Sequence, residues 1–128
     1  MPTRTQFDYA IVRVVPQVER DEFINVGVIL FCRNRHFLAV NFEPAWTRLQ
    51  AFAPALDMAD LYAHFELFSR VCEGGVGAGY IGQMSQSERF HWLVAPRSTI
   101  IQTSPAHSGL CVEPAATLEH LMATLVRL

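Results

Sequence analysis

The sequence contains no lysine, and all ten of its basic residues are arginine. Three enzyme classes need a lysine at the reacting groups: ATPases and GTPases with a Walker phosphate loop, protein kinases, and enzymes that bind pyridoxal phosphate as a Schiff base. The absence of lysine therefore argues against all three within this chain. Arginine remains available for bidentate contacts with an anion, where its planar guanidinium is better suited than an ammonium group.

An excess of positive charge is also absent. The 128 residues include 10 basic and 12 acidic side chains, which give a formal net charge of -2. Nucleic-acid-binding proteins usually carry a basic surface that neutralises phosphates. The charge balance argues against nucleic acid as a partner, and contact with it through Arg33, Arg35 and a nearby loop is the least favoured function.

The sequence also lacks paired cysteines, a signal peptide and a long hydrophobic segment. Cys32, Cys72 and Cys111 are odd in number and far apart, which argues against a disulfide framework. The first residues contain no apolar signal core, and no apolar run approaches the ~20 residues of a membrane-spanning helix. We therefore expect a cytoplasmic protein that does not associate with membranes.

The residues that are present supply enough apolar material for one core, since 51% are hydrophobic and 17% are charged. Segments rich in β-branched and aromatic residues predict three strands, and the short turns between them favour antiparallel pairing. These strands are expected at 7–15, 22–32 and 37–42. Shorter strands are expected at 99–103 and 110–112, whereas 89–95 fits either a strand or a helical turn.

Helices are predicted at three places. Asp57 is a suitable N-cap for a helix over 58–73, whose apolar residues recur at helical spacing and which Gly74 ends. Proline predicts the start of a short helix over 45–53 and of a C-terminal helix from Pro114. We predict a single domain over 1–128 of the α+β class. Its antiparallel sheet consists of an N-terminal three-stranded meander plus one or two later strands, with the two main helices packed on one face.

A glycine-rich segment, GAGYIG at 77–82, matches the G-x-G-x-x-G pattern of dinucleotide-binding proteins. In those proteins the glycines follow a strand and begin a helix. Here they follow the predicted helix 58–73, and no acidic residue stands about 20 positions further on. We interpret the segment as a flexible loop, with a mobile lid over a site as the alternative.

Polar side chains are concentrated between residues 95 and 109, a segment that contains no carboxylate. Arg97 would supply charge for a phosphate or carboxylate ligand, Ser98 and Thr99 would donate hydrogen bonds, and His107 would act as a general acid or base. The ordinary alternative is a turn whose serines and threonines have no ligand. The segment is therefore a candidate anion-binding site.

A second candidate site lies in the first hairpin. Arg13 and Asn25 are polar residues within apolar strands, and Gly27 leaves space beside Asn25. If Arg13 pairs with Asn25, the two side chains and the gap at Gly27 would line one pocket, whereas a shift of one residue would separate them. Alternatively, Asn25 satisfies a bulge and Arg13 covers apolar surface with its stem.

The sequence gives no metal-binding motif of the usual spacing. The pairs His36 with Cys32 and His107 with Cys111 are four residues apart, which is weak support for zinc, and the acidic first turn does not match a calcium loop. We expect no metal and no cofactor.

A resemblance to a known family rests on two segments, FDYAIVRVVPQVERDEFINVGVILFCR at 7–33 and RFHWLVAPRSTIIQTSPAHSGLCVEP at 89–114. Together they resemble a bacterial family of small proteins of unknown function. The resemblance covers nearly the whole chain. It implies a link to HipA-like serine/threonine kinases, beside which such proteins are often encoded, and it carries no catalytic residues.

Two functions follow as expectations. The first is a non-catalytic accessory or protein-interaction module, with a HipA-like kinase as partner. The second is an enzyme or sensor that binds a phosphorylated small molecule or nucleotide through the segment from Arg97 to His107. The small size and the lack of a recognised catalytic constellation favour the first.

Overall fold

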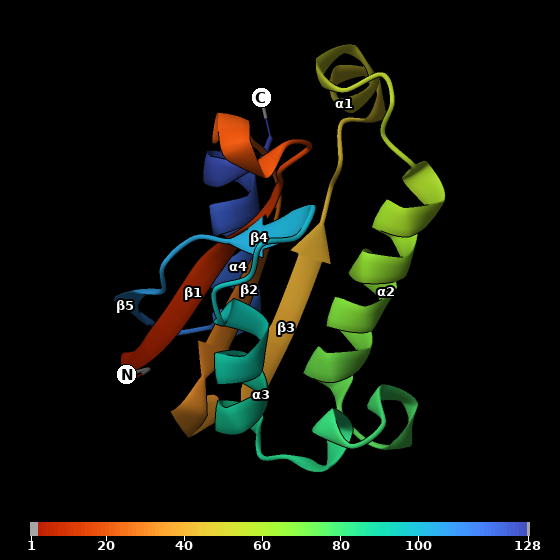
Figure 1. The fold of residues 1–128 in the computed structure, drawn as a ribbon. Helices are drawn as coiled ribbons and strands as arrows, with labels where there is room; N and C mark the ends of the chain where they lie inside the picture. Colours follow the sequence, from red (N-terminus) through yellow and green to blue (C-terminus); the bar gives the residue numbers. More distant parts are fainter. Residues whose placement is uncertain (1–2, 128) are drawn as a thin grey trace.

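The structure is a computed structural model that describes residues 3–127, and within them the chain forms one antiparallel sheet and four α-helices (Figure 1). The sheet has five strands in the order β3-β2-β1-β4, and β5 also pairs with β1. The long first strand therefore has three partners, with β4 and β5 against different parts of one edge. The α+β class, the N-terminal meander and the two later strands are confirmed. The strands are β1 (Thr5–Val14), β2 (Ile24–Cys32), β3 (Phe37–Phe42), β4 (Ile101–Thr103) and β5 (His107–Cys111).

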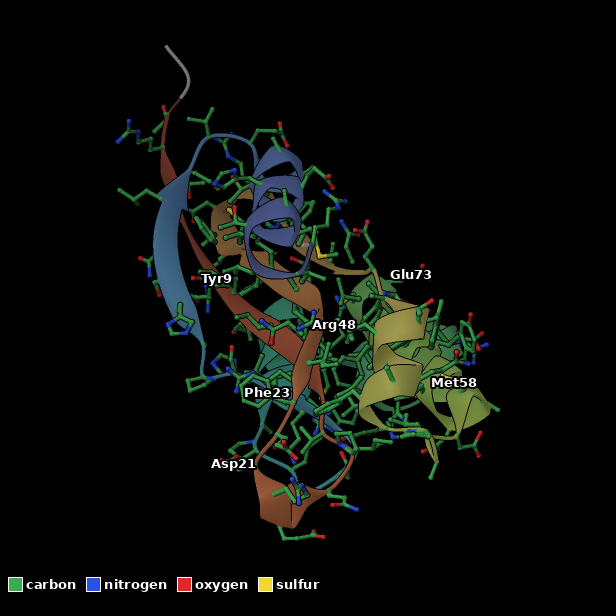
Figure 2. All side chains as sticks on the ribbon, turned by 90° about the horizontal axis from the view of Figure 1, so that it is seen from above. Tyr9, Asp21, Phe23, Arg48, Met58 and Glu73 are labelled. Atoms are coloured by element: carbon green, nitrogen blue, oxygen red, sulfur yellow. The ribbon has the colours of Figure 1, made fainter. Side chains whose placement is uncertain are left out.

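The helices cover both faces of the sheet (Figures 1 and 2). Ile29 and Phe31 of β2 belong to a core shared with α2 and α3, whereas Val28 and Leu30 belong to a second core shared with α4. The prediction placed the two main helices on one face, and the structure differs in this detail. The reason is that β2 is apolar on both faces, so each face needs a covering helix. The helices are α1 (Trp46–Phe52), α2 (Met58–Glu73), α3 (Gln86–Val94) and α4 (Pro114–Leu125).

The first hairpin contains a β-bulge. Val12 pairs with Gly27 but Arg13 pairs with Asn25, so Val26 is the additional residue. Gly27 is directly opposite Phe42 of β3, and a Cβ atom at Gly27 would stand 2.5 Å from the carbonyl oxygen of Asn41. Glycine is therefore required here by the close approach of β3 rather than by an unusual backbone conformation.

For residues 89–95 the sequence left strand and helical turn open; in the structure residues 89–94 belong to α3, and Ala95 is its C-cap. Ser85 caps this helix, because its side chain accepts a hydrogen bond from the backbone N–H of Glu88 while the Glu88 carboxylate accepts one from the Ser85 N–H. This reciprocal pair is a capping box. It is readable in the sequence as Ser-x-x-Glu at 85–88.

The glycine-rich segment before α3 contains two short 3-10 turns, 76–78 and 81–83. The N–H of Gly75 donates to the carbonyl of Gly82, which closes the segment on itself. Arg89, only 8% exposed, donates hydrogen bonds to the carbonyl oxygens of Val71, Cys72 and Met84. One buried guanidinium thus joins the end of α2, the turns and α3.

Candidate functional site

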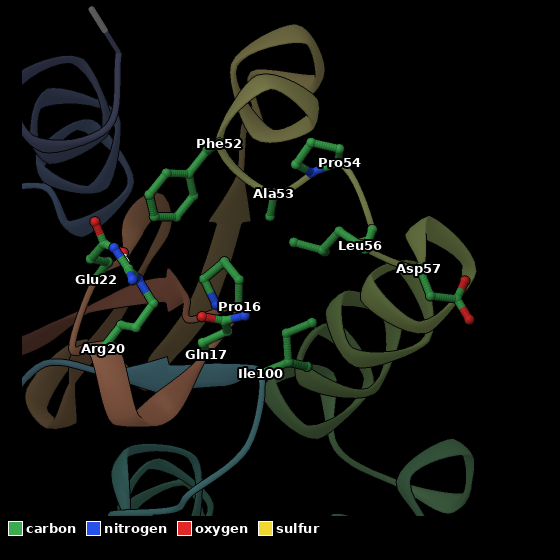
Figure 3. A pocket seen from close by; sticks show the side chains of 11 residues that line it. Pro16, Gln17, Arg20, Glu22, Phe52, Ala53, Pro54, Leu56, Asp57 and Ile100 are labelled. Atoms are coloured by element: carbon green, nitrogen blue, oxygen red, sulfur yellow. Dashed lines mark hydrogen bonds and ion pairs between the residues drawn. The ribbon is translucent and has the colours of Figure 1, made fainter.

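A cavity of about 330 Å³ opens where the β1–β2 turn faces the connection between α1 and α2 (Figure 3). We call it the apolar cavity, because hydrocarbon side chains make most of its wall. Its principal apolar lining residues are Pro16, Phe52, Pro54, Leu56 and Ile100. A concave apolar surface of this size is typical of a ligand or anchor-residue site.

The local sequence explains why the connection beside this cavity is held in place. Pro54 follows the C-cap of α1, and a proline cannot continue a helix. Asp57 begins α2 by accepting hydrogen bonds from the backbone N–H groups of Ala59 and Asp60, at 3.0 Å and 3.4 Å. Figure 3 shows the Asp57 carboxylate directed away from the cavity. The segment between these two fixed points presents its apolar side chains inward.

One ion pair lies at the rim of the apolar cavity. Arg20 donates a hydrogen bond to the carboxylate of Glu22, and this contact lowers the pKa of Glu22 below its ordinary value. Both side chains are about half exposed, so solvent screens the pair. The rim therefore offers matched charges to a partner, while the interior offers only apolar contact.

The predicted anion site is not gathered into one place. The Arg97 guanidinium donates to the carbonyl oxygen of Trp92 at 2.6 Å and lies over the rings of Trp92 and Phe68, with 5.0 Å and 5.4 Å to the ring centroids. Burial lowers the pKa of Arg97. The group caps the last turn of α3 and covers the core on the α2 side.

The other residues of that prediction lie elsewhere. Ser98 and Thr99 are exposed, and the Thr99 hydroxyl donates to the carbonyl oxygen of Ile101. His107 lies on β5 beside Tyr9, with 5.4 Å between ring centroids, and Tyr9 packs on the α4 side of the sheet. Because Arg97 contacts the opposite core, the structure does not bring Arg97 and His107 together. Anion binding by these residues stays a prediction.

The hairpin pocket is formed only in part. Arg13 and Asn25 are directly paired across the two strands, which is the register that a shared pocket requires. Arg13 lies over the ring of Phe23 at 4.1 Å, and Asn25 donates to the carbonyl oxygen of Leu125 at the end of α4. The Nε of Arg13 and the Oδ1 of Asn25 are buried without a hydrogen-bond partner in the described part of the chain.

Gly27 does not join this pair. The extra residue in β2 turns Gly27 to the other face, where it meets Phe42, while Asn25 faces α4. A bulge changes which residues share a face, and its position was not readable from alternation alone. Figure 2 shows Phe23 close to Asp21, at the end of the hairpin.

The three cysteines are buried and unpaired. Burial raises the pKa of the Cys72 thiol to about 12, and burial also raises the pKa of Cys111. A thiol in such surroundings stays protonated at neutral pH and is a poor nucleophile. Within residues 3–127 there is no group of three or more His, Cys, Asp or Glu side chains placed to hold a metal, and no helix long and apolar enough to cross a membrane.

Sequence reasoning missed the apolar cavity. Its wall combines residues from the first turn, from the connection after α1 and from the position just before β4, and only the tertiary structure brings these together. A usable local signal was the run of small and apolar residues APALD at 53–57, which contains Pro54 and ends at the cap residue Asp57. Such a run is unusual for a solvated connection.

The fold and the cavity describe a small α+β protein with an apolar cavity open to its surface. The comparison with protein families gives a match over residues 9–126 to the model described as protein of unknown function (DUF3037). The chain therefore belongs to this family. The comparison with curated proteins finds no match. The comparison with solved structures finds none either.

Proposed function

We propose that this protein is a non-catalytic interaction module that binds a partner protein through the apolar cavity. The observation that carries the proposal is the cavity itself: about 330 Å³, mostly apolar, and bounded by an ion pair. In protein interfaces a few large side chains that enter cavities of this kind contribute most of the binding energy. An apolar or aromatic side chain of the partner would fill this one.

The surface around the cavity supports the same interpretation. Val18, in the turn that supplies Gln17 and Arg20 to the wall, is 44% exposed although it is apolar. Arg20 and Glu22 hold one another in place at the rim, where polar contacts fix the orientation of a partner. An apolar centre with a polar rim is the usual anatomy of a protein interface.

The partner proposed here is a HipA-like serine/threonine kinase, which the resemblance of segments 7–33 and 89–114 implies. The lack of lysine argues against kinase activity in this chain itself, so the chain would act as the accessory protein. The three unpaired cysteines fit a reducing compartment, and cytoplasmic localisation is part of the proposal.

The test is a binding titration with a HipA-like kinase from the same organism. We expect a saturable complex at micromolar concentration, measured by sedimentation velocity. Ala55→Trp places a large side chain at the wall of the cavity and should weaken binding about tenfold or more. Ala123→Trp is the matched control, because Ala123 is exposed on α4, across the sheet.

Two outcomes would overturn the proposal. In the first, the two proteins sediment separately at micromolar concentration. In the second, Ala55→Trp and Ala123→Trp bind the kinase equally well, which would place any interface elsewhere. The alternative of phosphate or nucleotide binding is tested with the same material. A rise in Tm with inorganic phosphate or ATP that Arg97→Ala removes would favour it.

A further inference from the structure

A second cavity, of about 310 Å³, lies where the start of β1 and the end of β2 meet α3. We call it the polar cavity. Its wall comes from four parts of the chain that strand pairing and helix packing bring together, and neither the family nor the proposed interface accounts for it. The lining residues are Gln6, Asp8, Phe31, Arg33, Asn34 and His91.

Three of the polar side chains of this wall, Asp8, Arg33 and Asn34, are each held by a hydrogen bond to a group outside it. The Asp8 carboxylate accepts a hydrogen bond of 2.6 Å from the hydroxyl of Ser108 on β5. The Arg33 guanidinium donates to the hydroxyl of Ser87 at 3.1 Å. Asn34 donates through its amide nitrogen to the Thr5 hydroxyl at 2.8 Å. Each contact uses one polar atom, so each group keeps further donors or acceptors for a ligand.

The ring of His91 is fixed in a similar way. Its Nδ1 lies 2.7 Å from the backbone carbonyl oxygen of Ser87. A carbonyl oxygen only accepts hydrogen bonds, so Nδ1 carries a proton. In the neutral ring Nε2 is then an unprotonated acceptor, one further group that a donor on a ligand can use.

The polar cavity contains two charged side chains of opposite sign that do not pair with each other. Asp8 and Arg33 line the same cavity, yet within residues 3–127 they form no ion pair with each other, and the side-chain partner of each is a neutral hydroxyl. Two unlike charges around one small cavity are complementary to a ligand that carries both an ammonium and a carboxylate. The buried ring of Phe31, stacked on Phe90, adds an apolar wall.

We propose that the polar cavity binds a free α-amino acid. The Asp8 carboxylate receives the ammonium group, the Arg33 guanidinium binds the carboxylate, and Phe31 contacts the aliphatic part. The volume agrees with this ligand class, because about 310 Å³ stands at the lower end of the range for small-molecule sites. This inference is independent of the proposed protein interface, which uses other residues.

The test is a series of NMR titrations of the ¹⁵N-labelled protein with each of the common α-amino acids at millimolar concentration. We expect at least one to shift the amide signals around the cavity and the ring signals of His91. The N-acetyl derivative of that amino acid lacks the ammonium group, and its amide lacks the carboxylate. Each should bind about tenfold or more weakly, because each loses a charged hydrogen bond.

Two variants separate the two ends of the ligand. Asp8→Asn should weaken binding of the free amino acid but leave the N-acetyl derivative unaffected, and Arg33→Gln should do the same for the amide. Arg35→Gln is the matched control, because Arg35 is in the same turn but donates to the carbonyl oxygen of Thr3, outside the cavity. That variant should bind the amino acid as the unaltered protein does.

Three results would overturn the proposal. The first is that no amino acid shifts the cavity signals. The second is that acetate binds as tightly as the amino acid, which would show an anion site at Arg33 alone. The third is that the Asp8→Asn and Arg33→Gln variants, with unchanged Tm, bind the amino acid as tightly as Arg35→Gln does.

Discussion

The apolar and the polar cavity are similar in volume, about 330 Å³ and 310 Å³, but are built from different kinds of structure. The apolar cavity is walled largely by a turn and a connection, whose side chains meet through apolar contact. The polar cavity is walled by strands, the turn after β2 and α3, and hydrogen bonds hold its side chains in place. Volume alone therefore does not identify a ligand. The lining groups and what fixes them decide whether an apolar anchor or a charged molecule fits.

The largest effect is expected from replacing Arg89, which supports α3 and hence one wall of the polar cavity. Arg89→Met leaves the buried carbonyl groups of Val71 and Cys72 without their donor. We expect the free energy of unfolding to fall by about 3 kcal/mol, measured by urea denaturation. Amino-acid binding should be lost with the displaced helix, while partner binding at the apolar cavity should persist at a temperature where the variant is folded.

The control for Arg89 is Arg70→Met. Arg70 is exposed on α2, and among residues 3–127 its ion-pair partner is the likewise exposed Glu66, so its loss should change stability by less than about 1 kcal/mol. Equal destabilisation by the two variants would contradict the role given to Arg89.

Gly27 lines neither cavity, so a substitution there tests stability separately from binding. Gly27→Ala places a Cβ atom against the Asn41 carbonyl and the ring of Phe42, and the backbone contact cannot be relieved by a change of rotamer. We expect a loss of about 2 kcal/mol in urea denaturation, with ligand and partner affinities unchanged in the folded protein. Gly77→Ala is the control, since nothing lies within 4 Å of a Cβ atom there. Loss of affinity at only one cavity in Gly27→Ala would show that the cavity depends on the bulge.

A smaller effect is expected from truncating one lining side chain in each cavity. Phe52 is half-buried against the core on the α2 side, and Phe52→Ala should cost about 1 to 2 kcal/mol and widen the apolar cavity. The fluorescence of an apolar dye such as anilinonaphthalene sulfonate should increase in this variant. Asn34→Ala, which widens the polar cavity, should leave dye fluorescence unchanged. An equal increase in dye fluorescence in the Phe52→Ala and Asn34→Ala variants would contradict the assignment of one cavity as apolar and the other as polar.

The smallest expected effect is a pH dependence at the rim of the apolar cavity. Because the Arg20 hydrogen bond lowers the pKa of Glu22 from its ordinary value of 4.5, the pair contributes fully above pH 4.5. The contribution is lost as the pH falls below 4.5 and through the lowered pKa. Carboxyl NMR should show Glu22 titrating below pH 4.5, and Arg20→Gln should return its pKa towards 4.5. An unchanged Glu22 pKa in that variant would contradict the ion pair.

Much of the framework was predictable from the sequence, since strong local signals and tertiary packing agree. Helix α2 begins after Asp57 and ends before Gly74 as predicted, because capping and the end of an apolar stripe are local properties. The aromatic and β-branched runs of the first hairpin form strands, and Arg13 does pair with Asn25. The residues of α3 were ambiguous, because their apolar content suits either structure, although Ser85 and Glu88 carried the helix signal.

The sites could not be read from the chain in the same way. The predicted anion segment assumed that neighbours in sequence stay together, but the chain between Arg97 and His107 crosses from one sheet face to the other. Conversely, Asp8, Arg33 and His91 are far apart in sequence and share one cavity. Their proximity depends on strand register and on where α3 packs, neither of which a local pattern determines.

The single additional residue in β2 has a consequence for how the hairpin tolerates change. Beyond Val26 the strand towards the turn presents its odd-numbered Asn25 to α4, whereas in the remainder the even-numbered Val28 and Leu30 take that direction. The alternation of side chains in β2 therefore changes at the bulge. Removing one residue near Val26 would restore a regular alternation, and the residues between the bulge and the turn would then exchange the faces of the sheet to which they point. A substitution does not change which residues share a face, so the length of the strand, rather than its composition, keeps Asn25 beside the last turn of the C-terminal helix.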